Sequence, residues 1–268
     1  MKRGFYLQTS RIEEAHWWFR HRRRLAELLL GEPEGGAVAG PGLDVGCGSG
    51  GNLALVRRHG SPAVGLDLSP FALGLARQKH PEASLLRADA NHLADLFASG
   101  TFATIVMFNV LYHRWVADDG AVLRQAAGLV RPGGKLLLTE PAFRCLFRRH
   151  DVLDQGARRY RLPDLCEKVE AAGLSVTRAT YFNAPALAPA FLLAVAERLL
   201  GGRVSEGGGK EEAGELKLPA PWINRALYLA LAPERGWISR VGGIPAGVTA
   251  LVLAVKPEAD PPPPQVRT

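Results

Sequence analysis

The sequence predicts an α/β fold with a doubly wound parallel sheet. Between about residues 42 and 182, short apolar segments alternate with stretches of helical spacing, and this alternation is typical of strand–helix–strand units. Several of the apolar segments are almost free of polar residues, as strands are when helices cover both faces of a sheet. The chain has 268 residues, 47% of them hydrophobic, which is enough for a large core.

Seven segments have the length and composition of strands. Each is a short apolar run bounded by turn residues. In chain order, the expected strands cover residues 42–45, 63–68, 84–88, 102–110, 135–140, 174–181 and 247–256.

Helical segments are expected between these strands and after the sixth. Pro70 suits the first turn of a helix, Asp118 or Asp119 can cap another, and Gly173 suits the end of a third. In chain order, the expected helices cover residues 52–59, 70–79, 91–97, 118–130, 162–172, 186–200 and 222–232.

The sequence also predicts a division of the chain into five parts. They are an N-terminal helical cap (1–30), the core (31–182), a helical insertion (183–246), the last core strand (247–257) and a disordered Pro-rich tail (258–268). The insertion contains a Gly- and Glu-rich stretch, 201–216, that is expected to be a flexible linker. Long insertions of this kind act as lids or help to form an acceptor site.

Cysteine content and hydropathy exclude several classes of protein. The three cysteines lie far apart and form no CxxC pair, so a disulfide framework or a zinc ribbon is not expected. No metal site is expected, because the histidines show no ligand spacing. No run approaches the roughly 20 apolar residues of a membrane span, and the N-terminus lacks the apolar core of a secretory signal. A cytoplasmic location is the resulting expectation.

The charge is positive, with 33 Lys and Arg against 26 Asp and Glu, or +7. Much of the excess lies in residues 1–24 and 144–161. Such clusters can attract nucleic acid, anionic lipid or acidic substrates, but an ordinary solvated Arg-rich surface is the favoured interpretation.

The segment GLDVGCGSGGN, residues 42–52, joins an apolar strand to a helix. Gly46, Gly48 and Gly50 remove side chains where the backbone must turn or approach a ligand. The start of the following helix suits an anionic group. Gly46, Gly48 and Gly51 also satisfy the dinucleotide pattern GxGxxG, so the glycines alone do not identify the ligand.

Three acidic residues at successive strand ends narrow the choice of ligand. Asp44 precedes the first glycine, where it would repel a pyrophosphate and suit an ammonium group. Asp67 follows the second strand, where an acid can accept both hydroxyls of a ribose, and Asp89 follows the third, within reach of an adenine amino group. Together they describe a cationic adenosyl ligand without phosphates, and S-adenosylmethionine (SAM) fits that description.

Five segments resemble motifs of the class I SAM-dependent methyltransferases. They are LDVGCGSG (43–50), GLDLSP (65–70), RADA (87–90), FATIVMFNVLYHRW (102–115) and LVRPGGKLLLTEP (129–141). The resemblance implies a Rossmann-like sheet of seven strands, mostly parallel, with an antiparallel last strand. It also implies SAM as the cofactor. The expected cofactor contacts are Asp44, Val45, Gly46, Cys47, Gly48, Gly50, Asn52, Asp67, Leu68, Asp89, Ala90 and Asn109.

Three positions depart from the family pattern. Ala103 and Asn109 stand where the family often has Asp, and Tyr112 replaces the Glu before His113. Asn109 can still form hydrogen bonds, so we expect cofactor binding to persist. No role is carried over for the missing Glu.

The N-terminal segment HWWFRHRRR, residues 16–24, resembles the WWF-x-x-R leader of a bacterial subset of this family. The hypothesis is that Trp18, Phe19 and Arg22 close over the cofactor, with Arg22 near its carboxylate. The alternative is a first helix that only packs its aromatic side chains on the sheet.

His113, Cys47 and Asn52 each allow two interpretations. His113 follows the fourth strand, where it is a candidate general base, although a purely structural histidine is equally compatible. Cys47 fits better as a small buried residue than as a nucleophile. Asn52 suits either a helix cap or a cofactor contact.

The sequence therefore predicts a SAM-dependent methyltransferase that acts on a small-molecule, glycan or lipid-like acceptor. An RNA methyltransferase and a non-catalytic SAM-binding protein are the alternatives, although no RNA-binding module or NPPY signature is present. An NAD oxidoreductase is disfavoured by Asp44. Peripheral membrane contact and a homodimer remain open.

Overall fold

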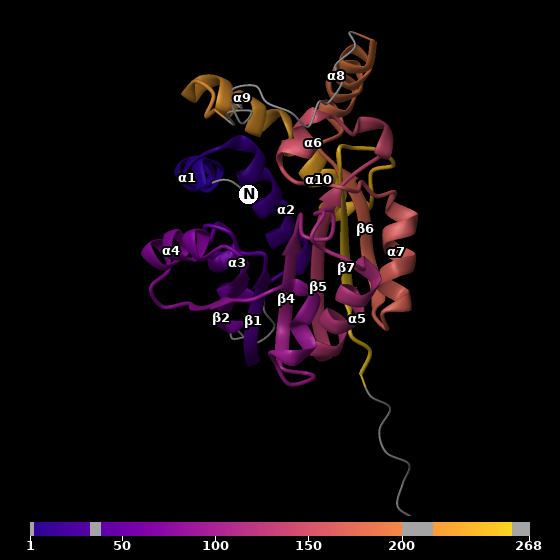
Figure 1. Cartoon of the computed structure of the whole chain (residues 1–268). Helices are drawn as coiled ribbons and strands as arrows, with labels where there is room; N and C mark the ends of the chain where they lie inside the picture. The colour runs from indigo at the N-terminus through magenta and orange to yellow at the C-terminus, as the bar shows by residue number, and fades with distance from the viewer. Residues whose placement is uncertain (1–2, 33–38, 200–216, 259–268) are drawn as a thin grey trace, which may run out of the picture.

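The computed structural model describes residues 3–32, 39–199 and 217–258. Its centre is a seven-stranded sheet in the order β3-β2-β1-β4-β5-β7-β6 (Figure 1). Strand β7 runs antiparallel to both of its neighbours, and the pairs among β1 to β5 are parallel. The predicted fold class is therefore confirmed. The strands are β1 (Ala39–Val45), β2 (Ser61–Asp67), β3 (Ser84–Arg87), β4 (Phe102–Phe108), β5 (Val130–Pro141), β6 (Ser175–Phe182) and β7 (Thr249–Val255).

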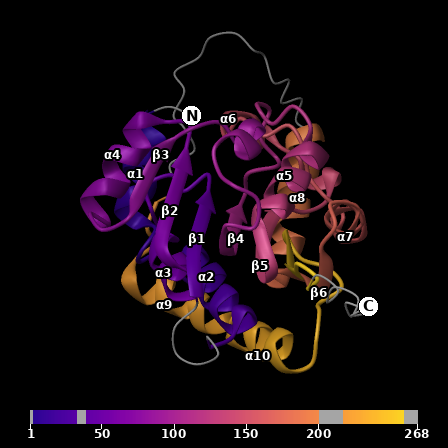
Figure 2. The same ribbon diagram turned by 90° about the horizontal axis from the view of Figure 1, so that it is seen from below.

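Helices cover both faces of the sheet, as Figure 2 shows from below. The α-helices are α1 (Arg3–Ile12), α2 (Trp17–Leu30), α3 (Leu53–His59), α4 (Pro70–Lys79), α5 (Asp119–Leu129), α6 (Arg149–Leu153), α7 (Leu162–Ala171), α8 (Leu187–Leu199), α9 (Pro221–Ala230) and α10 (Ala232–Arg240). Short 3₁₀ helices are η1 (Ala90–Asp95), η2 (Arg144–Leu146) and η3 (Ala184–Ala186).

Alternate side chains of the central strands supply two separate cores. In β4, Ile105 and Met107 pack with α5, α7 and η1, whereas Val106 and Phe108 pack with α2, α3 and α10. This follows from the two-residue repeat of a strand, which sends successive side chains to opposite faces. All four residues are buried, which explains why this segment is so uniformly apolar.

The structure corrects several predicted boundaries. The helix predicted over 91–97 is the 3₁₀ helix η1, and the strand predicted over 102–110 ends at Phe108 because Asn109 has a left-handed φ of 57°. The N-terminal cap consists of two helices, α1 and α2.

The prediction also missed α10. The proline at position 233 directly follows the helix predicted over 222–232, and it lies in the first turn of α10, where a proline costs no hydrogen bond. The predicted linker over 201–216 lies outside the described residues, as does all of the predicted tail except residue 258. The five-part division stays a prediction. Within the described part of the chain, no helix has the length and apolar character needed to cross a membrane.

Candidate functional site

A cavity of about 810 Å³ opens where the parallel strands β1, β2 and β4 end. Open α/β sheets bind their ligands at this edge, and the volume is within the usual range of small-molecule sites. The lining comes from helices α1 and α2, the turn after β1, the ends of β2 and β4 with their loops, and the 144–159 segment with α8.

The glycine-rich turn presents bare backbone to this cavity. Gly46 and Gly48 have left-handed φ values of 72° and 54°, which glycine adopts without strain. A Cβ at Gly46 would lie 2.9 Å from Cγ2 of Val110, so the turn packs closely on the loop after β4. The amide of Gly48 donates to Oδ2 of Asp67 at 2.9 Å.

Asp67 lines the cavity at the end of β2, as predicted. Its Oδ1 accepts the Ser69 amide at 2.8 Å, so each carboxylate oxygen is fixed by one backbone N–H. Burial raises the pKa of Asp67, while these two amides act in the opposite direction. Each oxygen retains capacity for a further hydrogen bond, which is the arrangement that a pair of ribose hydroxyls requires.

Asp44 and Val45 lie beneath the turn, and neither lines the cavity. Both carboxylate oxygens of Asp44 are buried without a hydrogen-bond partner among the described residues. Burial raises the pKa of Asp44 to about 8, although the nearby Arg22 acts in the opposite direction. Arg22 lines the cavity, with its guanidinium 4.8 Å from the ring centre of Phe108.

Asp89 is turned away from the cavity. Its Oδ1 accepts from the amide and the side-chain Nδ2 of Asn91, at 2.9 and 2.7 Å, and so caps η1. The residues on either side of it, Ala88 and Ala90, line the cavity, and so does Leu68. The predicted adenine-edge position is therefore built largely from backbone and small side chains.

Cys47 and Asn52 also line the cavity, whereas Gly50 packs against His80 and does not. The Cys47 side chain is buried beside Leu53, and burial raises the pKa of its thiol. Oδ1 of Asn52 is buried and has no hydrogen-bond partner among the described residues.

The loop after β4 brings Asn109 and His113 to the cavity. Oδ1 of Asn109 and Nδ1 of His113 are buried without partners in the described structure. The imidazole lies between the rings of Tyr112 and Trp115, each 4.1 Å away. Burial lowers the pKa of His113 to about 4, although the backbone of Gln155 acts the other way. The imidazole is therefore neutral at physiological pH.

Glu140, at the end of β5, holds this loop in place. Its carboxylate accepts the amides of Val110, Leu111 and Tyr112 at 3.1, 2.8 and 3.1 Å. Glu140 is fully buried. Three amide donors satisfy the carboxylate and set the path of the chain into His113.

The segment that carries the glycine-rich turn, Asp67 and the loop after β4 matches a known protein family. Residues 43–134 match the family described as "Methyltransferase domain". A demethylmenaquinone methyltransferase of Tropheryma whipplei is 32% identical over 134 residues, which are 50% of this chain and 52% of that protein. A ubiquinone biosynthesis O-methyltransferase of Xanthomonas euvesicatoria pv. vesicatoria is 37% identical over 101 residues, which are 36% of this chain and 41% of that protein.

The fold of the whole chain agrees with this match. An S-adenosylmethionine-dependent methyltransferase structure from Mesorhizobium loti superposes with a TM-score of 0.55 at 17% identity, covering 91% of this chain and 99% of that one. The chain contains a class I SAM-dependent methyltransferase domain. It spans about half the length, or less, of the curated relatives that it matches.

The methyltransferase domain has groups that fit SAM, the cofactor of this family. Asp67 can take the ribose hydroxyls, and the glycine turn leaves room for the sulfonium end. Arg22 supplies a positive charge for a carboxylate. The buried oxygens of Asn52 and Asn109, which lack partners in the described structure, can accept bonds from a ligand. No group of three or more metal-ligating side chains occurs in the described ranges.

Several residues of the site were not predicted. Tyr6 and Glu13, from α1 and the turn after it, line the donor end of the cavity. Leu146, Arg148 and Ala190 line the other end. They belong to no recognised motif, and only their position in the folded chain brings them to the cavity.

Proposed function

We propose that the protein is an enzyme that transfers the methyl group of SAM to a hydroxyl group of a small, largely apolar molecule. One observation supports this most directly: a single cavity is lined both by the donor residues around Asp67 and by the neutral His113, whose buried Nδ1 has no hydrogen-bond partner among the described residues. The relatives named demethylmenaquinone methyltransferase and ubiquinone biosynthesis O-methyltransferase favour an aromatic acceptor of the quinone or quinol type.

The acceptor end of the cavity is mainly apolar. Its lining includes Trp17, Trp115, Leu146, Ala190 and Val248. The charged side chains of the 144–159 segment that also line it are largely paired with one another. Arg159 is bound to Asp151 by two hydrogen bonds of 2.9 and 3.1 Å, and Nε2 of His150 lies 3.1 Å from Oδ2 of Asp154. A site with this lining favours a flat or hydrophobic acceptor over a sugar or a phosphate backbone.

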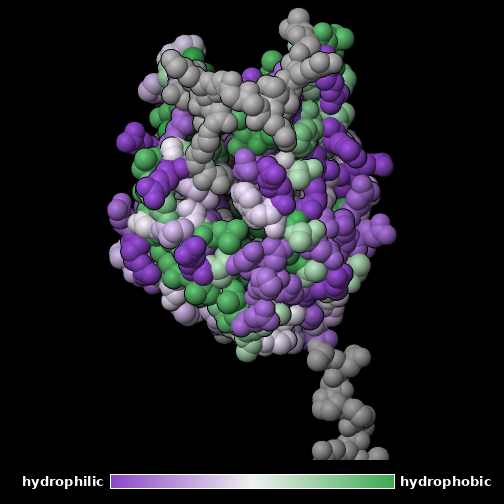
Figure 3. Space-filling view, in the orientation of Figure 1, coloured by the Kyte–Doolittle hydropathy of each residue, from purple (hydrophilic) through white to green (hydrophobic). Residues whose placement is uncertain are grey.

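The surface beside the cavity is apolar as well. Phe191, Leu192 and Leu193 on α8 and Trp222 on α9 are exposed, and Figure 3 shows hydrophobic surface around the upper end of α8. We propose that these side chains help a lipid-like acceptor to reach the site, and that contact with a membrane surface brings the enzyme to such acceptors.

When bound, SAM supplies an electrophilic methyl group. Arg22 and Asp67 hold the donor, and the apolar lining excludes water and aligns the acceptor. Alignment alone can lower a barrier by roughly 7–11 kcal/mol. Nδ1 of His113 receives the proton of the acceptor hydroxyl. Because the pKa of His113 is about 4, this weak base suits a phenolic hydroxyl, whose pKa is about 10, better than an aliphatic alcohol.

Radiolabelled SAM offers a direct test. The purified chain is incubated with methyl-labelled SAM and with catechol-type phenols, demethylated quinols, aliphatic alcohols or total RNA, and the labelled product is identified. We expect a methyl ether of a phenol or quinol, and no label when Asp67 is replaced by alanine. Label in RNA alone contradicts the proposal, and so does SAM binding without transfer to any acceptor.

A further inference from the structure

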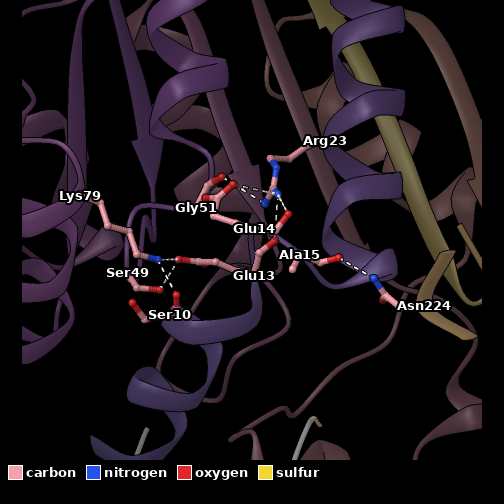
Figure 4. Close-up of polar contacts among 9 residues, drawn as sticks. All are labelled: Ser10, Glu13, Glu14, Ala15, Arg23, Ser49, Gly51, Lys79 and Asn224. Atoms are coloured by element: carbon pink, nitrogen blue, oxygen red, sulfur yellow. Dashed lines mark hydrogen bonds and ion pairs between the residues drawn. The ribbon is translucent and has the colours of Figure 1, made fainter. Parts of the chain in front are cut away.

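The turn between α1 and α2 places a carboxylate on the glycine-rich turn. Glu13 is only 5% exposed, and its Oε1 accepts the hydroxyl of Ser49 at 2.8 Å. Lys79, at the end of α4, forms an ion pair with the same oxygen and also donates to the carbonyl of Ser10 at 2.8 Å. Figure 4 shows the Glu13 side chain reaching toward Ser49 and Lys79. These contacts fix the carboxylate in one orientation.

The second oxygen of Glu13, Oε2, has no hydrogen-bond partner among the described residues, since both contacts end on Oε1. This atom lies against Gly51, where a Cβ would overlap it, so the glycine leaves the space that the carboxylate occupies. Glu13 lines the cavity together with Gly48 and Asn52. Asp44, which the sequence predicted for the ammonium group, does not line it.

A positive group lines the same cavity as this carboxylate. This group is Arg22, on α2, which is 7% exposed. Its guanidinium is held over the rings of Phe108 and Phe19, at 4.8 and 5.5 Å, and its Nε has no partner among the described residues. The two helices thus bring one fixed carboxylate and one fixed guanidinium to the donor end of the cavity.

A carboxylate and a guanidinium that line one cavity are complementary to a zwitterionic amino acid. An ammonium group donates three hydrogen bonds, and a carboxylate accepts from a guanidinium in a charge-assisted pair. We propose that Glu13 binds the ammonium group of SAM and that Arg22 binds its carboxylate. The N-terminal helices would then recognise the amino-acid end of the donor. This inference rests on SAM as the cofactor of the domain.

The proposal can be tested by calorimetry with four adenosyl ligands. They are S-adenosylhomocysteine, its analogue without the amino group, its analogue without the carboxylate, and methylthioadenosine, which has neither group. In Glu13→Gln we expect about 10-fold or greater weakening for the two ligands that carry the ammonium group. The other two ligands should bind within about threefold of wild type. Arg22→Met should weaken only the two ligands that carry the carboxylate.

Glu14→Gln is the matched control, because Glu14 is adjacent and exposed and does not line the cavity. It should bind all four ligands as wild type does. Retained binding of methylthioadenosine also shows that a variant is folded. If Glu13→Gln weakens the binding of all four ligands equally, the proposal is overturned. Glu13 would then only hold the N-terminal segment against the glycine-rich turn. Ammonium-selective loss in Asp44→Asn with none in Glu13→Gln overturns it too. If the wild-type chain binds none of the four, the cofactor assignment itself fails.

Discussion

His113 shows how the fold controls the ionisation of one side chain. Burial between two aromatic rings lowers its pKa from 6.5 to about 4. Between these values the unfolded chain binds a proton that the folded chain does not. The free energy of unfolding therefore falls as the pH drops from 6.5 towards 4, and above 6.5 this contribution is fully present.

His113→Gln should reduce this pH dependence. Between pH 7 and pH 4.5 the free energy of unfolding should fall less in the variant than in wild type, and the difference should be no more than about 3 kcal/mol. Urea unfolding at several pH values measures both slopes. His16 and His59, whose pKa values burial also lowers, contribute equally to both proteins, so the comparison isolates His113. Identical slopes in the two proteins would show that His113 titrates normally.

For the three acidic residues of the motifs, the sequence predicted the position in the fold but not the direction of the side chain. All three lie at or next to strand ends, as their motifs predict. Only Asp67 has its carboxylate on the cavity wall, because two backbone amides hold it there. Asp44 is covered by the turn, and Asp89 binds Asn91 instead. The direction of each side chain depends on neighbours that a motif does not specify.

At the scale of elements, periodicity predicted most strands and helices, and the errors have local causes. Asn109 ends β4 through a left-handed conformation that apolarity does not reveal. The proline at position 233 allows two interpretations, as the end of one helix or the first turn of the next, and the structure has the second.

Glu140→Gln tests the link between β5 and the loop that carries His113. A glutamine has one acceptor oxygen, and its NH₂ would face amides that also donate. We expect the variant to lose about 1–3 kcal/mol of stability in urea unfolding. Hydrogen exchange at Val110, Leu111 and Tyr112 should accelerate more than exchange in β7.

Glu82→Gln is the control for this substitution, since Glu82 forms its ion pair with Arg57 at the surface. It should unfold as wild type does. Unchanged exchange at the three loop amides in Glu140→Gln would mean that the loop holds its shape without the carboxylate.

At the scale of the whole molecule, the resemblance to a family predicted the sheet and placed the N-terminal segment near the cofactor, but no sequence pattern predicted the contacts between the insertion and α2. Asn224 on α9 accepts the amide of Trp17 at 2.8 Å and donates to the carbonyl of Ala15 at 2.9 Å. Helix α2, which carries Arg22, is thus held by the insertion. Contacts between residues that are more than 200 positions apart in the sequence form only in the complete fold.

Glu234 is the centre of this long-range connection. Its Oε1 accepts the amide of Asn183 at 2.7 Å and lies 3.0 Å from Nε2 of His21, and its Oε2 accepts the amide of Ala184 at 2.8 Å. Arg235 lies 3.0 Å from Nδ1 of His21. Since a guanidinium can only donate, Nδ1 accepts and the protonated Nε2 donates to Glu234. One buried carboxylate therefore joins α10, α2 and the end of β6.

Glu234→Gln should weaken this junction and lower the melting temperature. A glutamine keeps one acceptor oxygen, so at least one of the three donors loses its partner, at a cost of about 1.5–3 kcal/mol for a bond to a charged group. For a chain of this size, that corresponds to a decrease of roughly 3–10 °C. Differential scanning calorimetry measures it. Glu32→Gln, which removes an exposed surface pair with Arg58, should melt as wild type does. Equal melting temperatures for Glu234→Gln and wild type would show that apolar packing alone holds the insertion on α2.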